Sequence, residues 1–484
     1  MKSRFPSVFP LLSLSLALVS IAAAPRPADA NGNFSHVWVA TDALQYLEAG
    51  ELRDLLTRDD LREILRNGAM YPDGGYAIGD GYGEISHWEP FHLTYLDWIR
   101  TNFASPWSDE AARHIAFLMG MATHGTSDQL YDAMYLTRHA HYDENGSEAY
   151  ALGGVDGATD SCFAGTQGPM ALPEPWVPAE VLAPLYAVRG HDVDAATIEA
   201  GHNLVRVAIM VANDAAVHPD ILDDLLALYP WACGHQNDPG APGSPPTHGP
   251  AVARYWGTLW DRLHGIEDFD QPLLGVFSTG MTLYDVPGDA GTPDSWVSFA
   301  MPHGLDPGTV NAATVSVTGG DGAAHPVALD VYYGFNSHLV NIKPQENWAP
   351  DSNYTVTISP PLASWEGTPL GAPLSFGFST SAAPAVADVD TPDVTTEEIV
   401  EEIVEEVTGA EPAVENPDGR TEGTCTMSGR DAPVTVAPLA LLLLLGIGLR
   451  IVGHRRGGTG TPLAAHSVTG HGRLPVLNER GIRR

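Results

Sequence analysis

The chain has 484 residues, 44% of them hydrophobic, so it is long enough for more than one domain and can fill a sizeable core. Its formal net charge of -36 and its pI near 4.6 argue against a nucleic-acid scaffold, because phosphate backbones bind basic surfaces. The acidity still permits a site for phosphate, since bound metal ions can supply positive charge locally.

The first thirty residues have the pattern of a secretory signal peptide. Lys2 and Arg4 precede an apolar run over residues 8–24, and residues 28–30 (Ala-Asp-Ala) offer a cleavage site of small residues. A membrane-spanning anchor is the alternative, although the run is short and interrupted by a proline. We therefore expect an exported chain whose mature part begins at Asn31.

Residues 31–266 are predicted to form an all-α domain. Apolar residues recur there at helical spacing in segments separated by loops rich in Gly and Pro. The longest of these loops is expected over residues 153–178. The expected helices cover residues 36–47, 51–65, 88–103, 109–135, 179–188, 195–211, 219–228 and 251–263.

Short runs rich in Val, Thr, Phe and Tyr replace the helical pattern over residues 267–381, which predicts an antiparallel β-sandwich. Residues 301–307 (Met-Pro-His-Gly-Leu-Asp-Pro) and the ending 376–381 (Phe-Gly-Phe-Ser-Thr-Ser) resemble the bacterial Ig-like domains appended to secreted enzymes. Such domains serve as spacers or adhesion modules. We expect a spacer, because no catalytic constellation appears here. The clearest predicted strands are 296–300, 314–317 and 354–358.

Residues 382–424 are predicted to be a solvated acidic linker, because pairs of Glu repeat every four residues and would repel one another along a helix. Residues 425–457 contain a Cys motif, an apolar run and a basic cluster, and a tail of 458–484 follows. That order resembles the C-terminal sorting tails of bacterial surface proteins. The resemblance implies attachment to the cell surface or outer membrane, with cleavage of the tail as a route of release. A plain single-span anchor is the alternative, for which the run is short.

Export makes the cysteines informative. Cys162 and Cys233 fall within the same predicted domain and are candidates for one disulfide. Two free buried thiols are the alternative that the sequence leaves open. Cys425 lies apart from them, in the C-terminal motif.

Residue types that bind metals are ordered along the helical region. His124 and Asp128 are four residues apart on an apolar predicted helix, so both side chains project from one face, and Asp132 lies on that face again. His87 follows Ser86, a plausible N-cap for the next helix. Buried His and Asp are costly unless they are paired or bound to a cation, so the alternative to a metal site is a buried His–Asp pair.

Two further motifs complete the series. A Ser-His-Val-Trp motif at 35–38 contains His36, and a Tyr-Pro-Asp motif at 71–73 places Asp73 in a Gly-rich loop. In this order the motifs resemble the zinc-dependent phospholipase C family, and more closely the catalytic domain of glycosylphosphatidylinositol-specific phospholipase D. The resemblance covers residues 31 to about 265.

The resemblance implies a zinc centre in which the free amine of the mature chain and His36 bind one ion, and the Asp128 carboxylate bridges two. Asp73 would bind a second ion and also orient or deprotonate water. Two zinc ions are expected and a third is left open, because Tyr150 stands where the relative carries a His. His139, His141, Glu148 and Asp156 are as well explained as solvated loop residues, and His202 as a core histidine. The candidate metal ligands are Asn31, His36, Asp73, His87, His124, Asp128 and Asp132.

We therefore expect a surface-retained zinc-dependent phosphodiesterase that uses metal-activated water on a phospholipid or GPI-type lipid at a membrane surface. Phospholipase C and D cleavage are both left open, as is the oligomeric state. A Gly-x-Ser-x-Gly motif is absent, which disfavours a covalent serine mechanism. One alternative is a single-strand nuclease of the same fold, with Trp88 and Tyr76 stacking on bases, although no nucleic-acid partner is expected. The other is a surface adhesion protein with structural zinc, which the lack of Cys ligands disfavours.

Overall fold

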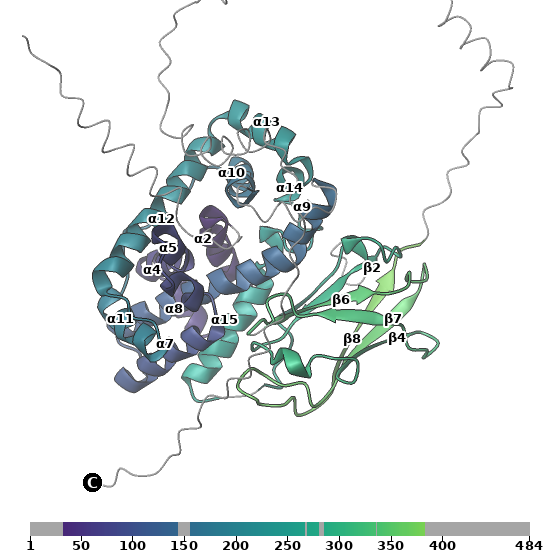
Figure 1. Ribbon diagram of the computed structural model, residues 1–484. Coiled ribbons are helices and arrows are strands. Elements are labelled where there is room, and N and C mark those ends of the chain that lie inside the picture. Colours follow the sequence, from purple (N-terminus) through teal and green to yellow (C-terminus); the bar gives the residue numbers. More distant parts are fainter. Residues whose placement is uncertain (1–31, 144–154, 267–268, 280–284, 335, 383–484) are drawn as a thin grey trace, which may run out of the picture. The chain divides into compact units, whose positions relative to one another are not determined.

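Helices fill the first part of the chain and strands fill the second (Figure 1). The computed structural model describes residues 32–143, 155–266, 269–279, 285–334 and 336–382, all within one compact unit. The predicted signal peptide, the hydrophobic C-terminal segment and nearly all of the acidic linker lie outside the described residues. The predicted fold class, a helical domain followed by an Ig-like sandwich, is confirmed for the part that is described.

The helical domain is a set of short and medium helices around the long helix α8. Helix α8 packs against α2, α4, α7 and α15. Their bounds are α2 (Asn33–Asp42), η1 (Ala43–Tyr46), α3 (Glu51–Leu56), α4 (Asp59–Met70), α5 (Asp73–Ile78), α6 (Tyr82–Ser86), α7 (Glu89–Asn102), α8 (Asp109–Leu130), the π-helical turn η2 (Tyr131–Leu136), α9 (Thr137–Tyr142), α10 (Val155–Gln167), α11 (Ala179–Val188), α12 (Ala195–Ala216), α13 (Pro219–Leu228), α14 (Pro230–His235), η4 (Pro245–Thr247) and α15 (Gly249–Leu263).

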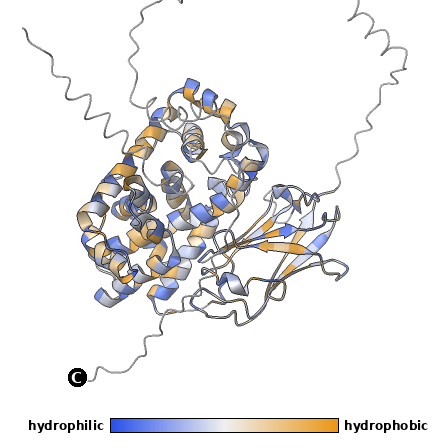
Figure 2. Ribbon diagram, in the orientation of Figure 1, coloured by the Kyte–Doolittle hydropathy of each residue, from blue (hydrophilic) through white to orange (hydrophobic). Residues whose placement is uncertain are grey.

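Glycines allow α8 to lie unusually close to its neighbours. A Cβ atom on Gly120 would stand 2.0 Å from the carbonyl oxygen of Leu65 in α4, so only glycine fits at this crossing. The start of α8 is fixed by Ser108, whose hydroxyl accepts a hydrogen bond from the amide of Ala111. Apolar stretches alternate with polar ones along these helices in Figure 2, as expected for helices with one buried face.

Several predicted elements are confirmed and others are wrong. Helices α11 and α13 have the predicted bounds. The predicted loop 153–178 is wrong, because it contains α10, whose buried Val155, Ala158, Cys162 and Phe163 follow helical spacing. Its Gly, Thr, Asp and Ser residues have low helix propensity and hide that pattern.

The segments around two candidate ligands also differ from the prediction. Asp73 begins helix α5 and does not lie in a loop. Ser86 ends α6, with its hydroxyl donating to Tyr82 O and Gly83 O, and Trp88 takes the N-cap position of α7. The predicted N-cap role of Ser86 is therefore wrong, because its hydroxyl is already used within the preceding turn.

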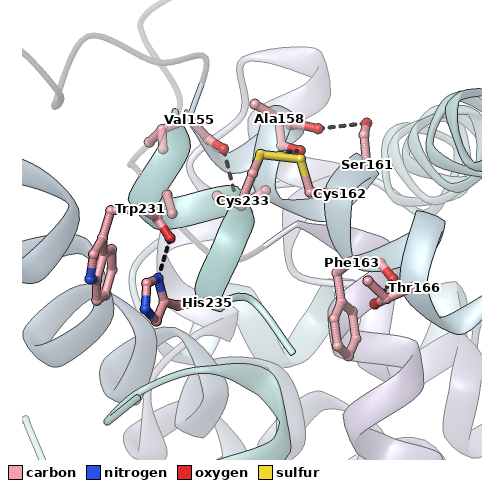
Figure 3. Close-up of a disulfide and its surroundings, with 12 residues drawn as sticks. Val155, Ala158, Ser161, Cys162, Phe163, Thr166, Trp231, Cys233 and His235 are labelled. Atoms are coloured by element: carbon pink, nitrogen blue, oxygen red, sulfur yellow. Dashed lines mark hydrogen bonds between the residues drawn. A yellow bond between two sulfur atoms is a disulfide. The ribbon is translucent and has the colours of Figure 1, made fainter. Parts of the chain in front are cut away.

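A disulfide joins α10 to α14. Cys162 and Cys233 are bonded, with their Cα atoms 5.4 Å apart (Figure 3). Of the two alternatives that the sequence left open, the structure has the disulfide.

The second domain is a sandwich of two four-stranded sheets, with orders β1-β3-β6-β5 and β2-β8-β7-β4. Pairing is antiparallel except between β2 and β8, which are parallel. The predicted strands 296–300, 314–317 and 354–358 correspond to β3, β4 and β7. The bounds are β1 (Gly275–Phe277), β2 (Asp285–Val286), β3 (Val297–Ala300), β4 (Val315–Gly319), β5 (Val327–Asp330), β6 (Leu339–Pro344), β7 (Asn353–Ile358) and β8 (Leu374–Thr380).

The sandwich has its own apolar core between the sheets, to which β3, β6 and β7 contribute alternate side chains such as Phe299, Ile342 and Val356. Leu274, Phe277, Ala300 and Leu339 instead belong to the core of the helical domain, so the two domains share apolar packing. Among the described residues, none of the helices has the length and apolar character needed to span a bilayer.

Candidate metal centre

His36 is held in the first turn of α2, and that turn is fixed by a carboxylate from another helix. Asp160 of α10 accepts hydrogen bonds from the amides of Phe34 and Ser35 at 2.9 and 2.8 Å and from the Ser35 hydroxyl at 2.7 Å. The first amides of a helix lack partners within it, and a negative charge there is favourable. Sequence analysis missed Asp160 because its segment was predicted to be a loop.

His87 and His124 point ring nitrogens at one another. The Nδ1 atom of His87 lies 2.6 Å from the carbonyl oxygen of Gly83, and that of His124 lies 2.6 Å from the carbonyl oxygen of Ala69. A carbonyl only accepts, so each Nδ1 carries a proton, and in the neutral rings each Nε2 presents a lone pair. The two Nε2 atoms are 3.0 Å apart. Lone pairs at that distance repel one another unless a proton or another cation lies between them.

Two carboxylates converge on the same point. Asp128 Oδ1 lies 3.0 Å from His36 Nε2, while its Oδ2 lies 3.2 Å from His87 Nε2 and 3.3 Å from His124 Nε2. Asp73 Oδ1 lies 3.3 Å from His124 Nε2 and 3.6 Å from His87 Nε2. We call these five residues the cluster. The structure therefore brings together five of the seven predicted ligands.

Asp73 is oriented by a neighbour from α2. The Asn33 amide donates to Asp73 Oδ2 at 2.8 Å, which leaves Oδ1 facing the histidines. The Asp73 side chain is 16% exposed, whereas those of His36 and His124 are fully buried. The cluster therefore meets solvent on the side of Asp73.

The carboxylates make the cluster favourable for positive charge. Burial lowers the pKa of His87, but hydrogen bonds and charges from Asp128 and Asp73 outweigh burial and raise that pKa to about 10. Burial would raise the pKa of Asp73, yet the charges and hydrogen bonds of His124 and His87 hold it well below its usual range. A proton on the histidines or a bound metal ion would each meet this demand for a cation.

The residues of the cluster fit a zinc ion by donor type. Imidazole nitrogens and carboxylate oxygens are zinc ligands, and ligating histidines usually donate their other ring N–H to a carbonyl or carboxylate, as His87 and His124 do. Two groups of three have donor atoms close enough to share an ion, namely His36 with His124 and Asp128, and Asp73 with His87 and His124. His124 belongs to both groups but has one nitrogen to offer, so it can serve one ion.

The remaining predicted residues lie elsewhere. Asp132 stands in the π-helical turn after α8 and outside both groups, where it accepts a hydrogen bond from Tyr333 of the Ig-like domain. Asn31 lies outside the described residues. His139 pairs with Asp143 at 2.9 Å and likewise belongs to neither group. His141 and Asp156 are also in neither group, and Glu148 and Tyr150 are not among the described residues.

Two other buried histidines are accounted for by protein partners. His248 Nε2 donates to the Gly243 carbonyl at 2.9 Å, so its Nδ1 accepts from the Ser127 hydroxyl at 2.6 Å. His202 Nε2 donates to Asn67 Oδ1 at 2.9 Å and is 1% exposed, which confirms the predicted core histidine.

Gly125 allows the two histidine-bearing segments to meet. A Cβ atom at this position would stand 1.9 Å from the carbonyl oxygen of His87. A side chain here would push the His87 segment away from α8 and separate His87 from His124.

Half-buried aromatic rings lie beside the segment that carries His87. The ring centroids of Tyr76 and His87 are 5.0 Å apart, and the Tyr76 hydroxyl and the Trp88 indole both donate to Glu84. Tyr333 lies edge-on to Trp88 at 4.9 Å. We call Tyr76, Trp88 and Tyr333 the aromatic rim. The sequence suggested the first two, but nothing in it connected Tyr333 to them.

Comparison with known proteins identifies the second domain. Residues 288–380 match the family model of the bacterial Ig-like domain. They form an Ig-like domain. Two solved structures of the surface-layer protein SbsC align with the chain. The alignment with one of them, the crystal structure of rSbsC(31-844), includes 71% of this chain and 46% of that chain. With a TM-score of 0.18 and 9% identity, neither alignment supports an inference about the fold.

The chain is also distantly similar to phosphatidylinositol-glycan-specific phospholipase D. The Bos taurus protein is 27% identical over 107 residues, which make up 20% of this chain and 12% of that protein. The Homo sapiens protein is 27% identical over 149 residues, or 27% of this chain and 18% of that protein, and the Dictyostelium discoideum protein is 28% identical over 102 residues, or 19% and 11%. The chain thus spans less than a fifth of the length of these relatives.

Proposed function

We propose that the chain is a metal-dependent phosphodiesterase that hydrolyses a phospholipid or a GPI-type lipid. The observation that carries this proposal is the convergence of His87 Nε2 and His124 Nε2, 3.0 Å apart, with the carboxylates of Asp73 and Asp128. The distant similarity to phosphatidylinositol-glycan-specific phospholipase D supports the substrate class. The resemblance of the metal-binding motifs to zinc-dependent phospholipase C supports zinc as the metal.

Asp73, His87 and His124 would hold one zinc ion, and Asp128 would reach it with Oδ2. His36 and Asp128 Oδ1 would hold a second ion, for which the amino terminus at Asn31 is the further predicted ligand. Zinc supplies Lewis acidity when bound, which lowers the pKa of water toward neutrality and offsets negative charge on phosphoryl oxygens. A third ion at Asp132 would share that carboxylate with the Tyr333 hydroxyl.

Asp73 is the candidate for handling the proton of the attacking water. Its depressed pKa keeps it ionised at neutral pH, and the Asn33 amide holds Oδ2. Oδ1 can therefore orient a water molecule on the solvent side of the cluster and accept a hydrogen bond from it. Tyr76 and Trp88 would flank the lipid headgroup beside this water.

The same proposal places the enzyme outside the cytoplasm, retained at the surface by its C-terminal segment. The disulfide between Cys162 and Cys233 supports this, because disulfides persist mainly in oxidising compartments. The predicted signal peptide points the same way. The membrane surface is then both the site of attachment and the source of substrate.

The test is hydrolysis by the full chain, exported so that its amino terminus is free. Phosphatidylcholine and a GPI-anchored reporter are supplied with zinc, with chelator, and with chelator followed by zinc. We expect chelator to abolish turnover and zinc to restore it. Diacylglycerol as product identifies phospholipase C cleavage, and phosphatidic acid identifies phospholipase D cleavage.

The Asp73→Asn variant should lose turnover. The matched control is His202→Asn, which changes a buried histidine outside the cluster and should retain turnover. A chain that binds zinc tightly and cleaves neither lipid contradicts the proposal. Cleavage of single-stranded DNA by that chain would favour the nuclease alternative. If the chain cleaves neither lipid nor DNA, zinc with a purely structural role is favoured.

A further inference from the structure

The Ig-like domain binds the helical domain next to the residues of the cluster. Glu89, two residues after His87, is 1% exposed. In the described part of the chain, the hydrogen bonds to its carboxylate all come from residues of the Ig-like domain. The donors are His303 Nδ1 at 2.7 Å, the Gly304 amide at 2.7 Å and the Trp365 indole at 2.9 Å. The segment that carries His87 is thus fixed by the second domain.

The segment that carries Asp128 is fixed in the same way. Gln129, the next residue, is 4% exposed and its Oε1 accepts from the His338 amide at 2.7 Å. Asp132, further along the same segment, accepts from the Tyr333 hydroxyl. Glu89 thus meets the segments that follow β3 and β7, whereas Gln129 and Asp132 meet the loop between β5 and β6. A spacer joined by a linker does not require contacts at two separate segments.

Tyr333 is an Ig-like residue that contacts both Trp88, next to His87, and Asp132, one turn after Asp128. It is half-buried, its ring lies edge-on to Trp88 at an interplanar angle of 73°, and its hydroxyl binds the carboxylate of Asp132. A hydrogen bond from a neutral hydroxyl does not remove the charge of the Asp132 carboxylate, but it fixes the position of that carboxylate. The Tyr333 side chain thus connects Trp88 with Asp132.

We propose that Tyr333 is a positioning residue. It holds Asp132, one helical turn after the ligand Asp128, and together with Trp88, which follows the ligand His87, it determines which phosphodiesters reach the cluster. The part of this proposal that concerns the substrate rests on the proposed function. The Ig-like domain would then be a component of the enzyme's site, and the expected role of a spacer would be replaced.

The test uses three variants of the full chain. Tyr333→Phe keeps the ring and removes the hydrogen bond to Asp132, and Tyr333→Ala removes both. Tyr354→Phe is the matched control, because it removes a tyrosine hydroxyl within the sandwich, where that hydroxyl accepts from the Ala349 amide. Thermal unfolding of each variant shows whether the domains remain folded.

The first measurement is the rate at which bound zinc passes to excess EDTA, which requires no catalysis. The Tyr333→Ala variant should release zinc about tenfold faster, since the rim no longer shields the cluster, while Tyr354→Phe should match the wild-type chain. The second measurement is lipid hydrolysis. Tyr333→Phe should raise KM about tenfold and leave kcat within about threefold, because the loss of one hydrogen bond to a charged group has roughly this effect.

A double-mutant cycle with Asp132→Ala separates positioning from a general loss of structure. The effects of Tyr333→Phe and Asp132→Ala on KM should overlap and not add, because each removes the hydrogen bond between Tyr333 and Asp132. Additive effects, or wild-type zinc release and KM in both Tyr333 variants, would overturn the inference. A wild-type chain that holds zinc but hydrolyses no lipid sinks the proposed function alone, since the zinc-release comparison still decides the role of Tyr333. A chain that binds no zinc overturns both.

Discussion

The protein buries two groups of histidines, and they are satisfied in opposite ways. In the cluster, the Nε2 atoms of His87 and His124 face each other across 3.0 Å, and Asp73 and Asp128 approach the same point. At the interface between the domains, a single carboxylate, that of Glu89, receives three hydrogen bonds from well-placed donors. The first arrangement has more acceptors than donors, whereas the second is balanced.

The difference distinguishes a functional site from a structural contact. Buried polar groups that are fully paired rigidify a structure and need nothing further. Converging acceptors are costly unless a cation joins them. The interface group at Glu89 therefore stabilises the fold, and the cluster is where chemistry is expected. Changes in the two groups should have different consequences.

The largest effect is expected from His124→Ala, which removes a ligand that belongs to both groups of three. At least one equivalent of zinc should be lost, and lipid hydrolysis should fall on the order of a thousandfold, since a metal ion contributes several kcal/mol of transition-state stabilisation. Zinc content by atomic emission and kcat/KM check this. Full retention of zinc by the variant would remove His124 from the metal centre.

The next effect is expected from Glu89→Gln, which leaves His303 without its carboxylate. Removing one partner of a buried ion pair costs about 3 kcal/mol or more, so the free energy of unfolding should fall by that amount. Zinc content of the folded variant should stay at the wild-type level, which is the contrast with His124→Ala. Denaturant unfolding and metal analysis of the same samples test both halves. Loss of zinc without loss of stability would contradict the assignment of Glu89 to fold stability and of the cluster to metal binding.

The pH dependence of this stabilisation follows from both partners. Burial raises the pKa of Glu89, but the charge and hydrogen bond of His303 outweigh it and lower that pKa from 4.5 to about 2. Its contribution is complete above about pH 4.5 and is lost as pH falls through about 2. Burial lowers the pKa of His303, but Glu89 raises it above 6.5, so that contribution is complete below pH 6.5 and lost as pH rises through the raised value. The wild-type advantage over Glu89→Gln should therefore be largest between about pH 4.5 and 6.5, and a flat difference from pH 2 to 9 would contradict it.

The smallest effect is expected from Asn33→Ala, which removes the amide that holds Asp73 Oδ2. Partners of metal ligands typically contribute 10–100-fold to activity or metal affinity, so kcat/KM should fall by about that factor. Asn213→Ala is the matched control, because the Asn213 amide donates to the Met170 carbonyl away from the cluster. Equal kinetic effects of the two variants would show that Asn33 acts only on stability.

Sequence patterns predicted the residues of the cluster better than they predicted what holds them. His124 and Asp128 lie on a strongly periodic helix, so their shared face followed from spacing alone. The helix that carries Asp160 was missed, because its apolar residues are separated by poor helix formers and its position depends on a disulfide partner 71 residues away. Such partners leave no local signal.

Tyr333 could not be predicted for a related reason. It lies 201 residues after Asp132 in the sequence, in a loop of a domain whose strands indicated only a sandwich. Periodicity gives the faces of elements but does not tell which loop of one domain meets which helix of another. The same limit applies to Glu89, whose donors lie more than 200 residues further along the chain.

The distance between Glu89 and its partners has a consequence for the order of events on the ribosome. Trp365 is made 276 residues after Glu89, and at the usual rates of synthesis that interval is roughly 15 to 55 s. Until Trp365 has been made, the Glu89 carboxylate lacks at least one of the three donors that bind it in the folded protein. The hydrogen bonds that fix the His87 segment can therefore form only after these parts of the sandwich have been made. The residues of the cluster are synthesised long before the residues of the second domain that support the segment beside them.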